Sequence, residues 1–317
     1  MSSLETNLGK VKLKNPILLA SGTCGVAARE FEPYFKLSDL GSIVTKSLSI
    51  KPRVGNPTPR VVEVSPACGM LNSIGLQNPG IEYFVKNELP YLTEQKVTCV
   101  INIVGETLDD YLQAVDVIKN KSEFCAIELN LSCPNVEGGL DFSQDPKKAF
   151  TMVSEVKKIT NIPVWAKLSP NITDITEIAK ACIDAGSDGL CLINTVLGLA
   201  INRWTKKPVL PRGVGGYSGP AIKPIALRMI WETYKKFPKT PIIGIGGIHT
   251  TDDAIEFLLC GASAIQIGTA NFVNPKASIE IIEGLKKYME QMKISSINEI
   301  VGQAHLQSEK PLAKSAY

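Results

Sequence analysis

Two lysines and three asparagines each stand at the end of a short apolar run in this 317-residue sequence. The lysines are Lys46 and Lys167, and the asparagines are Asn102, Asn130 and Asn194. A lysine beside an apolar core is costly to bury unless an anion meets it, so one such residue alone could be half of a structural ion pair. Two ammonium and three amide groups on one rim instead indicate a site for a polar, anionic ligand.

Glycines end two further apolar runs, at Gly246-Gly247 and at Gly268 before Thr269. Glycine lets a phosphate approach backbone N–H groups closely, and a helix that begins beyond it adds a favourable dipole. These run ends therefore predict a phosphate site, with tight turns alone as the alternative.

Cys133 differs from the other cysteines because it lies in a loop after an apolar run, where Pro134 restricts it to an extended or turn geometry. A thiol has a reference pKa of ~8.5 and can abstract a proton once it is desolvated beside a carbon acid. Cys133 is thus the candidate catalytic residue, and an inert loop cysteine is the alternative.

The elements that must position these residues alternate between strand and helix patterns. Eight apolar runs are typical of parallel strands covered on both faces, and helical spacing recurs between them. Eight such alternations predict an α/β (β/α)8 TIM barrel, in which the residues after the strands share one rim. A doubly wound sheet is the alternative, but no GxGxxG fingerprint opens a first βαβ unit. The runs are 17–20, 42–46, 97–104, 124–131, 163–168, 189–194, 241–245 and 264–267, with long insertions after strand 2 (47–79) and strand 6 (195–219).

Composition argues against several other classes of protein. The formal net charge is +3, from 34 Lys and Arg against 31 Asp and Glu, which is too weak to indicate nucleic acid. Eight cysteines without a CxxC spacing and two histidines argue against a metal site. There is no signal-peptide pattern and no apolar stretch of ~20 residues, so we predict a cytoplasmic protein without a membrane span. We expect one domain over 1–317, with a flexible tail over 305–317.

The sequence resembles the class 1 dihydroorotate dehydrogenases in motifs that run in order from about residue 10 to 304. The wording LQNPG, with Gln77 and Asn78, is similar to the B-type, NAD+-linked catalytic subunit rather than to the fumarate-using A type. Two departures touch the substrate loop, because residues 64–68 are slightly longer than in the family and Ser73 replaces a commoner alanine. The motifs are VTKS (44–47), GNPTPR (55–60), GMLNSIGLQNPG (69–80), NLSCPN (130–135), AKLSPN (166–171), LINT (192–195), GGYSGPAIKP (215–224) and IGTANF (267–272).

The resemblance implies an FMN-dependent barrel that oxidises (S)-dihydroorotate to orotate in pyrimidine (UMP) biosynthesis. It implies that Cys133 removes the C5 proton while hydride leaves C6 for flavin N5, and that Lys167 stabilises charge on the reduced flavin. Residues 136–140 would form a lid. The implied FMN contacts are Ser21, Lys46, Ser47, Asn102, Asn130, Lys167, Ile193, Gly219, Gly246, Gly247, Gly268 and Thr269. The implied substrate contacts are Lys46, Asn72, Ser73, Ile74, Gly75, Leu76, Asn130, Asn135, Asn194 and Thr195.

The resemblance also implies partners. B-type relatives pass electrons to NAD+ through a second subunit that carries FAD and a [2Fe-2S] cluster, and this chain has no spacing typical of either group. We therefore expect a homodimer that joins such a subunit in a heterotetramer, with FAD and the cluster on the partner. The alternatives are a stand-alone A-type enzyme that uses fumarate, a non-catalytic flavin-binding barrel, and a barrel that acts on a sugar phosphate.

Overall fold

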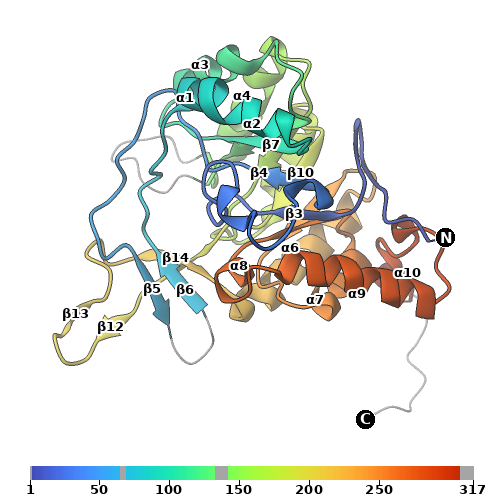
Figure 1. Cartoon of the computed structure of the whole chain (residues 1–317). Helices are drawn as coiled ribbons and strands as arrows, with labels where there is room; N and C mark the ends of the chain where they lie inside the picture. Colours follow the sequence, from blue (N-terminus) through green and yellow to red (C-terminus); the bar gives the residue numbers. More distant parts are fainter. Residues whose placement is uncertain (1, 65–68, 133–141, 308–317) are drawn as a thin grey trace.

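Eight parallel strands close into a barrel at the centre of the computed structural model, which describes residues 2–64, 69–132 and 142–307 (Figure 1). Each strand pairs with the next barrel strand along the chain, and β16 pairs with β3 to close the ring. The prediction of a (β/α)8 TIM barrel is confirmed. The barrel strands are β3 (Ile17–Leu19), β4 (Ser42–Val44), β7 (Cys99–Ile103), β8 (Ala126–Asn130), β9 (Val164–Lys167), β10 (Gly189–Leu192), β15 (Ile242–Ile245) and β16 (Ala264–Ile267).

Every predicted apolar run contains one of these strands, and the strands are buried on both faces. Alternate residues divide between two hydrophobic clusters. Leu18 and Val100 belong to the cluster inside the barrel, whereas Ile17 and Ile101 belong to the cluster between the barrel and its helices. This double burial is the reason that the strands appear in the sequence as almost uninterrupted apolar runs.

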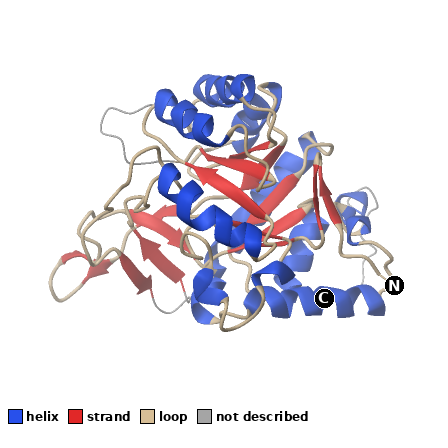
Figure 2. Ribbon diagram, turned by 45° about the horizontal axis from the view of Figure 1, so that its top comes forward, coloured by secondary structure: helices blue, strands red, loops and turns tan. Residues whose placement is uncertain are grey.

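Helices form the outer layer around the barrel (Figure 2). Capping side chains set several helix starts: Asp174 Oδ1 accepts a hydrogen bond from the backbone N–H of Thr176, and Thr250 forms a capping box with Asp253. Within the described residues, no helix is both long and apolar enough to cross a membrane. The helices are α1 (Ile81–Tyr83), α2 (Leu89–Glu94), α3 (Leu108–Ile118), α4 (Pro146–Ile159), α5 (Ile175–Asp184), α6 (Lys223–Lys236), α7 (Thr251–Cys260), α8 (Ala270–Val273), α9 (Ala277–Gln291) and α10 (Gln303–Gln307), with a π-helical segment (Phe84–Glu88) between α1 and α2 and 3-10 turns at Arg29–Phe31, Leu37–Asp39, Pro220–Ile222 and Ile297–Glu299.

A hairpin of β1 (Thr6–Leu8) and β2 (Val11–Leu13) precedes the barrel. Its buried residues Leu8, Val11 and Leu13 pack into the interior cluster together with Trp165 of β9. The hairpin therefore fills one end of the barrel with apolar side chains and leaves the polar residues at the other end to build a site.

The two predicted insertions are not independent loops, because they pair in one antiparallel sheet. Its order is β11-β14-β6-β5, so a strand of the second insertion lies beside a strand of the first. In Figure 1 this sheet projects from the barrel, and the hairpin of β12 and β13 extends beyond it. The strands are β5 (Val61–Val64), β6 (Gly69–Asn72), β11 (Val196–Gly198), β12 (Ile201–Asn202), β13 (Lys207–Pro208) and β14 (Gly215–Ser218).

The described residues of the expected tail, 305–307, belong to α10. The His305 ring stacks on Trp231 with a centroid distance of 3.7 Å, and its Nε2 lies 3.0 Å from the carbonyl oxygen of Cys260. His305, the predicted first residue of the tail, is thus docked against the body of the protein, and residues 308–317 of that prediction lie outside the described residues.

Candidate functional site

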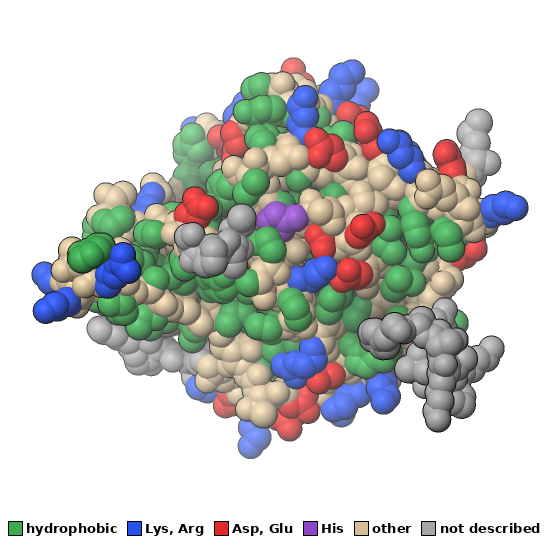
Figure 3. Space-filling view, turned by 90° about the horizontal axis from the view of Figure 1, so that it is seen from below, with side chains coloured by type: hydrophobic (Ala, Val, Ile, Leu, Met, Phe, Trp, Pro, Cys, Tyr) green, Lys and Arg blue, Asp and Glu red, His purple; other side chains and the backbone are tan. Residues whose placement is uncertain are grey.

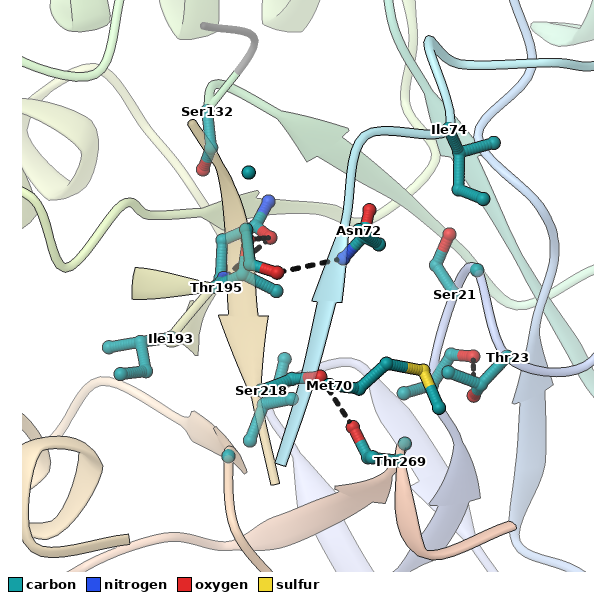
Figure 4. A pocket seen from close by; sticks show the side chains of 18 of the residues that line it. Ser21, Thr23, Met70, Asn72, Ile74, Ser132, Ile193, Thr195, Ser218 and Thr269 are labelled. Carbon is teal, nitrogen blue, oxygen red and sulfur yellow. Dashed lines mark hydrogen bonds between the residues drawn. The ribbon is translucent and has the colours of Figure 1, made fainter. Parts of the chain in front are cut away.

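A cavity of about 530 Å³ lies at the carboxyl ends of the barrel strands, beside the sheet that the two insertions form (Figure 4). Its walls combine residues that follow β3, β4, β8, β10, β15 and β16 with residues of β6 and β14. The rim of a TIM barrel at this end is where ligands bind in proteins of this fold. The cavity is therefore the candidate site.

The sequence-predicted residues converge on this cavity. Asn102 is the exception among those that the structure describes, while Cys133 and Asn135, with the expected lid at 136–140, lie outside the described residues. Ser132, the last described residue before Cys133, lines the wall. The predicted residues that line the cavity are Ser21, Lys46, Ser47, Asn72, Ser73, Ile74, Gly75, Leu76, Asn130, Lys167, Ile193, Asn194, Thr195, Gly219, Gly246, Gly247, Gly268 and Thr269.

The expectation that Asn102 ends its strand is wrong. β7 continues to Ile103, so Asn102 lies within the strand and its fully buried side chain faces the barrel interior. There, Asn102 Nδ2 donates a 2.5 Å hydrogen bond to Oε1 of Glu128. Asn102 thus lies behind the cavity wall.

The cavity is electropositive. Its charged lining residues among those described are Lys46, Lys167 and Arg212, and no described carboxylate lines it. Burial lowers the pKa of Lys46, and the nearby positive charges of Arg60 and Lys167 lower it further. An anion beside Lys46 would offset both effects, so this wall is suited to a negatively charged ligand.

The amides of the central wall hold one another in place. Asn130 Oδ1 accepts hydrogen bonds from Asn194 Nδ2 and from the backbone N–H of Ser132, both at 3.2 Å. Asn194 Oδ1 accepts from the backbone N–H of Thr195 at 2.7 Å, and Asn72 Nδ2 donates to the carbonyl of Gly216 at 3.2 Å. Amides fixed in this way present defined donors and acceptors to a heterocyclic ligand.

The glycine-rich end of the cavity has little room for side chains. Gly247 has φ of +78°, and a Cβ there would lie 2.7 Å from the backbone nitrogen of Lys223 at the start of α6. Beside it, Thr269 Oγ1 donates a 2.8 Å hydrogen bond to Ser218 Oγ (Figure 4). Backbone exposed at glycines can accept a phosphate at close range.

The described cysteines do not compete for a catalytic role. None lines the cavity, and each is a free thiol. Burial raises the pKa of Cys24, of Cys125, of Cys182 and of Cys260 to about 12. Within the described residues, no group of three His, Cys, Asp or Glu side chains could hold a metal ion.

Two polar residues at the cavity floor were missed in the sequence. Glu128 lies in β8 two residues before Asn130, and Gln266 lies in β16 two residues before Gly268. Both are buried, and Gln266 lines the cavity. A signal was available, because residues two apart on a strand face the same side and a polar residue inside a buried strand needs a partner.

Comparisons with known proteins agree on one family. The family model described as "Dihydroorotate dehydrogenase" matches residues 3–289. The chain is 47% identical over 300 residues to "Dihydroorotate dehydrogenase B (NAD(+)), catalytic subunit" of Geotalea uraniireducens, covering 94% of this chain and 97% of that protein. It is also 47% identical over 304 residues to "Putative dihydroorotate dehydrogenase A (fumarate)" of Aquifex aeolicus, covering 95% and 98%.

The fold has a counterpart among solved structures. The crystal structure of DHODH in complex with ferulenol from Eimeria tenella superimposes with a TM-score of 0.80 and covers 95% of this chain and 88% of that one. The two sequences are 21% identical, so this likeness supports the barrel architecture alone.

Proposed function

The chain belongs to the dihydroorotate dehydrogenase family, and from that premise we propose that its cavity binds FMN and oxidises (S)-dihydroorotate to orotate in pyrimidine biosynthesis. The observation that carries the proposal is the composition of the cavity wall. The backbone of Gly246 and Gly247, the ammonium groups of Lys46 and Lys167, and a cluster of amides meet in one cavity without a described carboxylate. Both proposed ligands are anionic.

The residues present fit FMN. Gly246, Gly247 and Gly268 would hold the phosphate with their backbone, which carries no side chain at the cavity, and Thr269 would add its backbone and hydroxyl. Ser21 Oγ, at the same cavity, is buried without a partner and is free to bond a ligand. When bound, FMN supplies the acceptor for hydride. The remaining proposed contacts are Lys46, Ser47, Asn102, Asn130, Lys167, Ile193 and Gly219. Of these, Asn102 does not line the cavity and would act indirectly, through its hydrogen bond to Glu128.

The substrate would lie between Lys46 and the amides. Lys46 offers a charge-assisted hydrogen bond to the substrate carboxylate, and Asn72, Asn130 and Asn194 offer paired donors and acceptors to the ring N–H and C=O groups. Cys133 accepts the C5 proton as general base. Ser73, Ile74, Gly75, Leu76 and Thr195 complete the proposed substrate site, together with Asn135.

The electrons would then leave through a partner subunit to NAD+. This proposal rests on the names of B-type relatives, each of which is called a catalytic subunit. The proposal assigns FAD and the [2Fe-2S] cluster to the partner, as the sequence resemblance implies. The A-type relative is equally similar to the chain, at 47% identity, so fumarate is the competing acceptor. Purification with the partner subunit should give dihydroorotate-dependent NAD+ reduction. Rapid fumarate-coupled turnover by the isolated chain, without NAD+ activity, would instead assign it to the A type.

We also propose a homodimer, which works in the cytoplasm. Leu199, Ile201 and Trp204, on or beside β12 at the projecting end, are large exposed apolar residues, with Trp204 79% exposed. Figure 3 shows hydrophobic side chains at this end together with Lys and Arg side chains. Large apolar side chains exposed close together in the chain favour an interaction site. The six described cysteines are free thiols, as is typical of a reducing compartment.

Replacing the proposed base tests the chemistry. Cys133→Ala should keep bound FMN, seen as the flavin absorption spectrum of the purified chain, but lose at least ~10²-fold in the rate of flavin reduction by dihydroorotate. Anaerobic stopped-flow absorbance measures that rate. Cys125→Ala, which changes a cysteine remote from the cavity, should reduce at the wild-type rate. If Cys133→Ala reduces as fast as Cys125→Ala, Cys133 is not the base.

A further inference from the structure

Glu128 places a negative charge inside the barrel, directly behind the cavity. It lies on β8 two residues before Asn130 and is 0% exposed. Its carboxylate accepts hydrogen bonds from three other strands. Asn102 Nδ2 on β7 donates to Oε1 at 2.5 Å, Lys167 Nζ on β9 donates to Oε1 at 3.3 Å, and Gln266 Nε2 on β16 donates to Oε2 at 2.6 Å.

The pair of Glu128 and Lys167 is unusually deep. Among the ion pairs of the described residues, it is the one in which both side chains are nearly inaccessible, at 7% for Lys167 and 0% for Glu128. A buried ion pair of this kind gives little net stability, because desolvation of both charges offsets their attraction. Its presence at the wall of a ligand cavity therefore calls for a role other than stabilising the barrel.

The carboxylate also decides which way two amides face. Because Asn102 and Gln266 both turn their NH2 groups to Glu128, their oxygens must face elsewhere, and both oxygens are buried without a partner. Gln266 and Lys167 line the cavity. Glu128 thus holds the Lys167 ammonium group and fixes the orientation of the Gln266 amide, both on residues that line the cavity.

We propose that Glu128 is a positioning residue that balances the charge of Lys167 and fixes the amide of Gln266 at the cavity that would hold the flavin, and that its negative charge would hold down the flavin reduction potential. The inference rests on the proposed function. Two-electron reduction leaves negative charge on the flavin ring, which Lys167 favours and Glu128 opposes. The Glu128 charge would therefore affect both how readily bound FMN accepts hydride from the substrate and how readily it passes electrons on.

Glu128→Gln tests this role, because it removes the charge and keeps the shape. We expect the equilibrium between oxidised and reduced FMN to shift at least about tenfold toward the reduced form, which is about +30 mV for a two-electron couple. Anaerobic redox titration of the FMN-loaded chain against a dye of known potential measures the shift. A potential equal to that of the wild type, or lower, would overturn the proposal.

Two controls separate charge from structural damage. Glu128→Asp keeps the charge, so the ratio of reduced to oxidised FMN at a given potential should stay within about tenfold of the wild-type ratio. This corresponds to a shift in the reduction potential of less than about 30 mV. Asp188→Asn removes another largely buried carboxylate, which pairs with Lys157 Nζ at 2.6 Å before the amino end of β10, away from the cavity. Its potential should not move, and an upward shift as large as that of Glu128→Gln would contradict the assignment.

A double variant covers the case in which Glu128→Gln fails to fold. Glu128→Gln combined with Lys167→Gln removes both members of the buried pair, a change that proteins often tolerate. Because Lys167 lines the cavity and Glu128 lies behind it, the reference for this double variant is Lys167→Gln alone, which differs from it only in the Glu128 charge. The equilibrium between oxidised and reduced FMN should lie at least about tenfold further toward the reduced form in the double variant than in Lys167→Gln, which is about 30 mV. Equal potentials in these two variants would contradict the role of the Glu128 charge. If the wild-type chain binds no flavin, the proposed function fails, whereas an unmoved potential in a flavin-loaded variant refutes only the role of Glu128.

Discussion

Replacing Gly247 by alanine should weaken FMN binding through two costs that the structure separates. The residue has φ of +78°, and this left-handed conformation costs an alanine ~1–2 kcal/mol. The new Cβ would also lie 2.7 Å from the backbone nitrogen of Lys223, and relieving such overpacking costs ~1–3 kcal/mol. The total is about 2–5 kcal/mol.

The strain of Gly247→Ala should appear mainly as lost affinity. We expect the loop between β15 and α7 to relieve the strain by shifting while the cavity is empty, and FMN binding to require its return. At 1.4 kcal/mol per tenfold change, the FMN dissociation constant should rise about 30-fold to about 4,000-fold. Titration of the apoprotein with FMN, followed by quenching of flavin fluorescence, measures it.

Gly213→Ala is the matched control for Gly247→Ala. Gly213 has φ of +82°, so alanine meets the same backbone cost, but nothing lies within 4 Å of the added Cβ and the residue does not line the cavity. It should lose ~1–2 kcal/mol of folding stability in urea titration and keep wild-type FMN affinity. Equal FMN affinities for the two variants would refute the inference that close approach at Gly247 shapes the phosphate site.

Three further predictions concern the substrate, the dimer and the fold. Lys46→Gln should weaken orotate binding about 10-fold to 150-fold, the value of a charge-assisted hydrogen bond of ~1.5–3 kcal/mol, as measured by the change that orotate causes in the flavin spectrum. Trp204→Glu should shift a dimer toward monomers in sedimentation velocity, because it places a charge on the exposed apolar end. Asp174→Ala should cost ~1 kcal/mol in urea unfolding at neutral pH, whereas Asp174→Asn keeps the cap and costs less. Hydrogen bonds from Thr176 lower the pKa of Asp174, so the folded state gains stability above the unfolded pKa and loses it as pH falls through the folded pKa, and the difference between wild type and Asp174→Ala should shrink in acid.

The barrel could be predicted from the sequence because its strands are covered on both faces. Such strands need apolar side chains at successive positions, and this short-range pattern is visible in a single sequence. The polar residues that end two of the strands could also be predicted from the sequence. Asn130 is the last residue of β8 and Lys167 the last residue of β9, and both line the cavity.

The errors at the site share one physical cause. Asn102 is predicted to end its strand, but β7 continues to Ile103, and the Asn102 amide faces the barrel interior. Glu128 and Gln266 were read as parts of apolar runs, although their partners come from other strands. Whether a polar residue in a strand faces a ligand or another side chain depends on neighbours that are distant in the sequence, and residue spacing along one strand does not contain that information.

The sheet of the two insertions was missed for a related reason. Antiparallel pairing depends on cross-strand neighbours more than on the propensity of each strand, and here the paired residues Asn72 and Gly216 are separated by 144 positions. The sequence patterns predicted the insertions after strands 2 and 6, but the pairing between them became visible only in three dimensions.

Because of that pairing, we expect the two insertions to be compatible only when both come from the same protein. Asn72 of the first insertion hydrogen-bonds the backbone of Gly216 in the second, and β6 is held between β5 and β14. A chimaera that takes residues 47–79 from one relative and 195–219 from another would pair a β6 strand with a β14 strand from a different protein. Recombination, natural or designed, should therefore conserve substrate specificity only when both segments are exchanged as a pair.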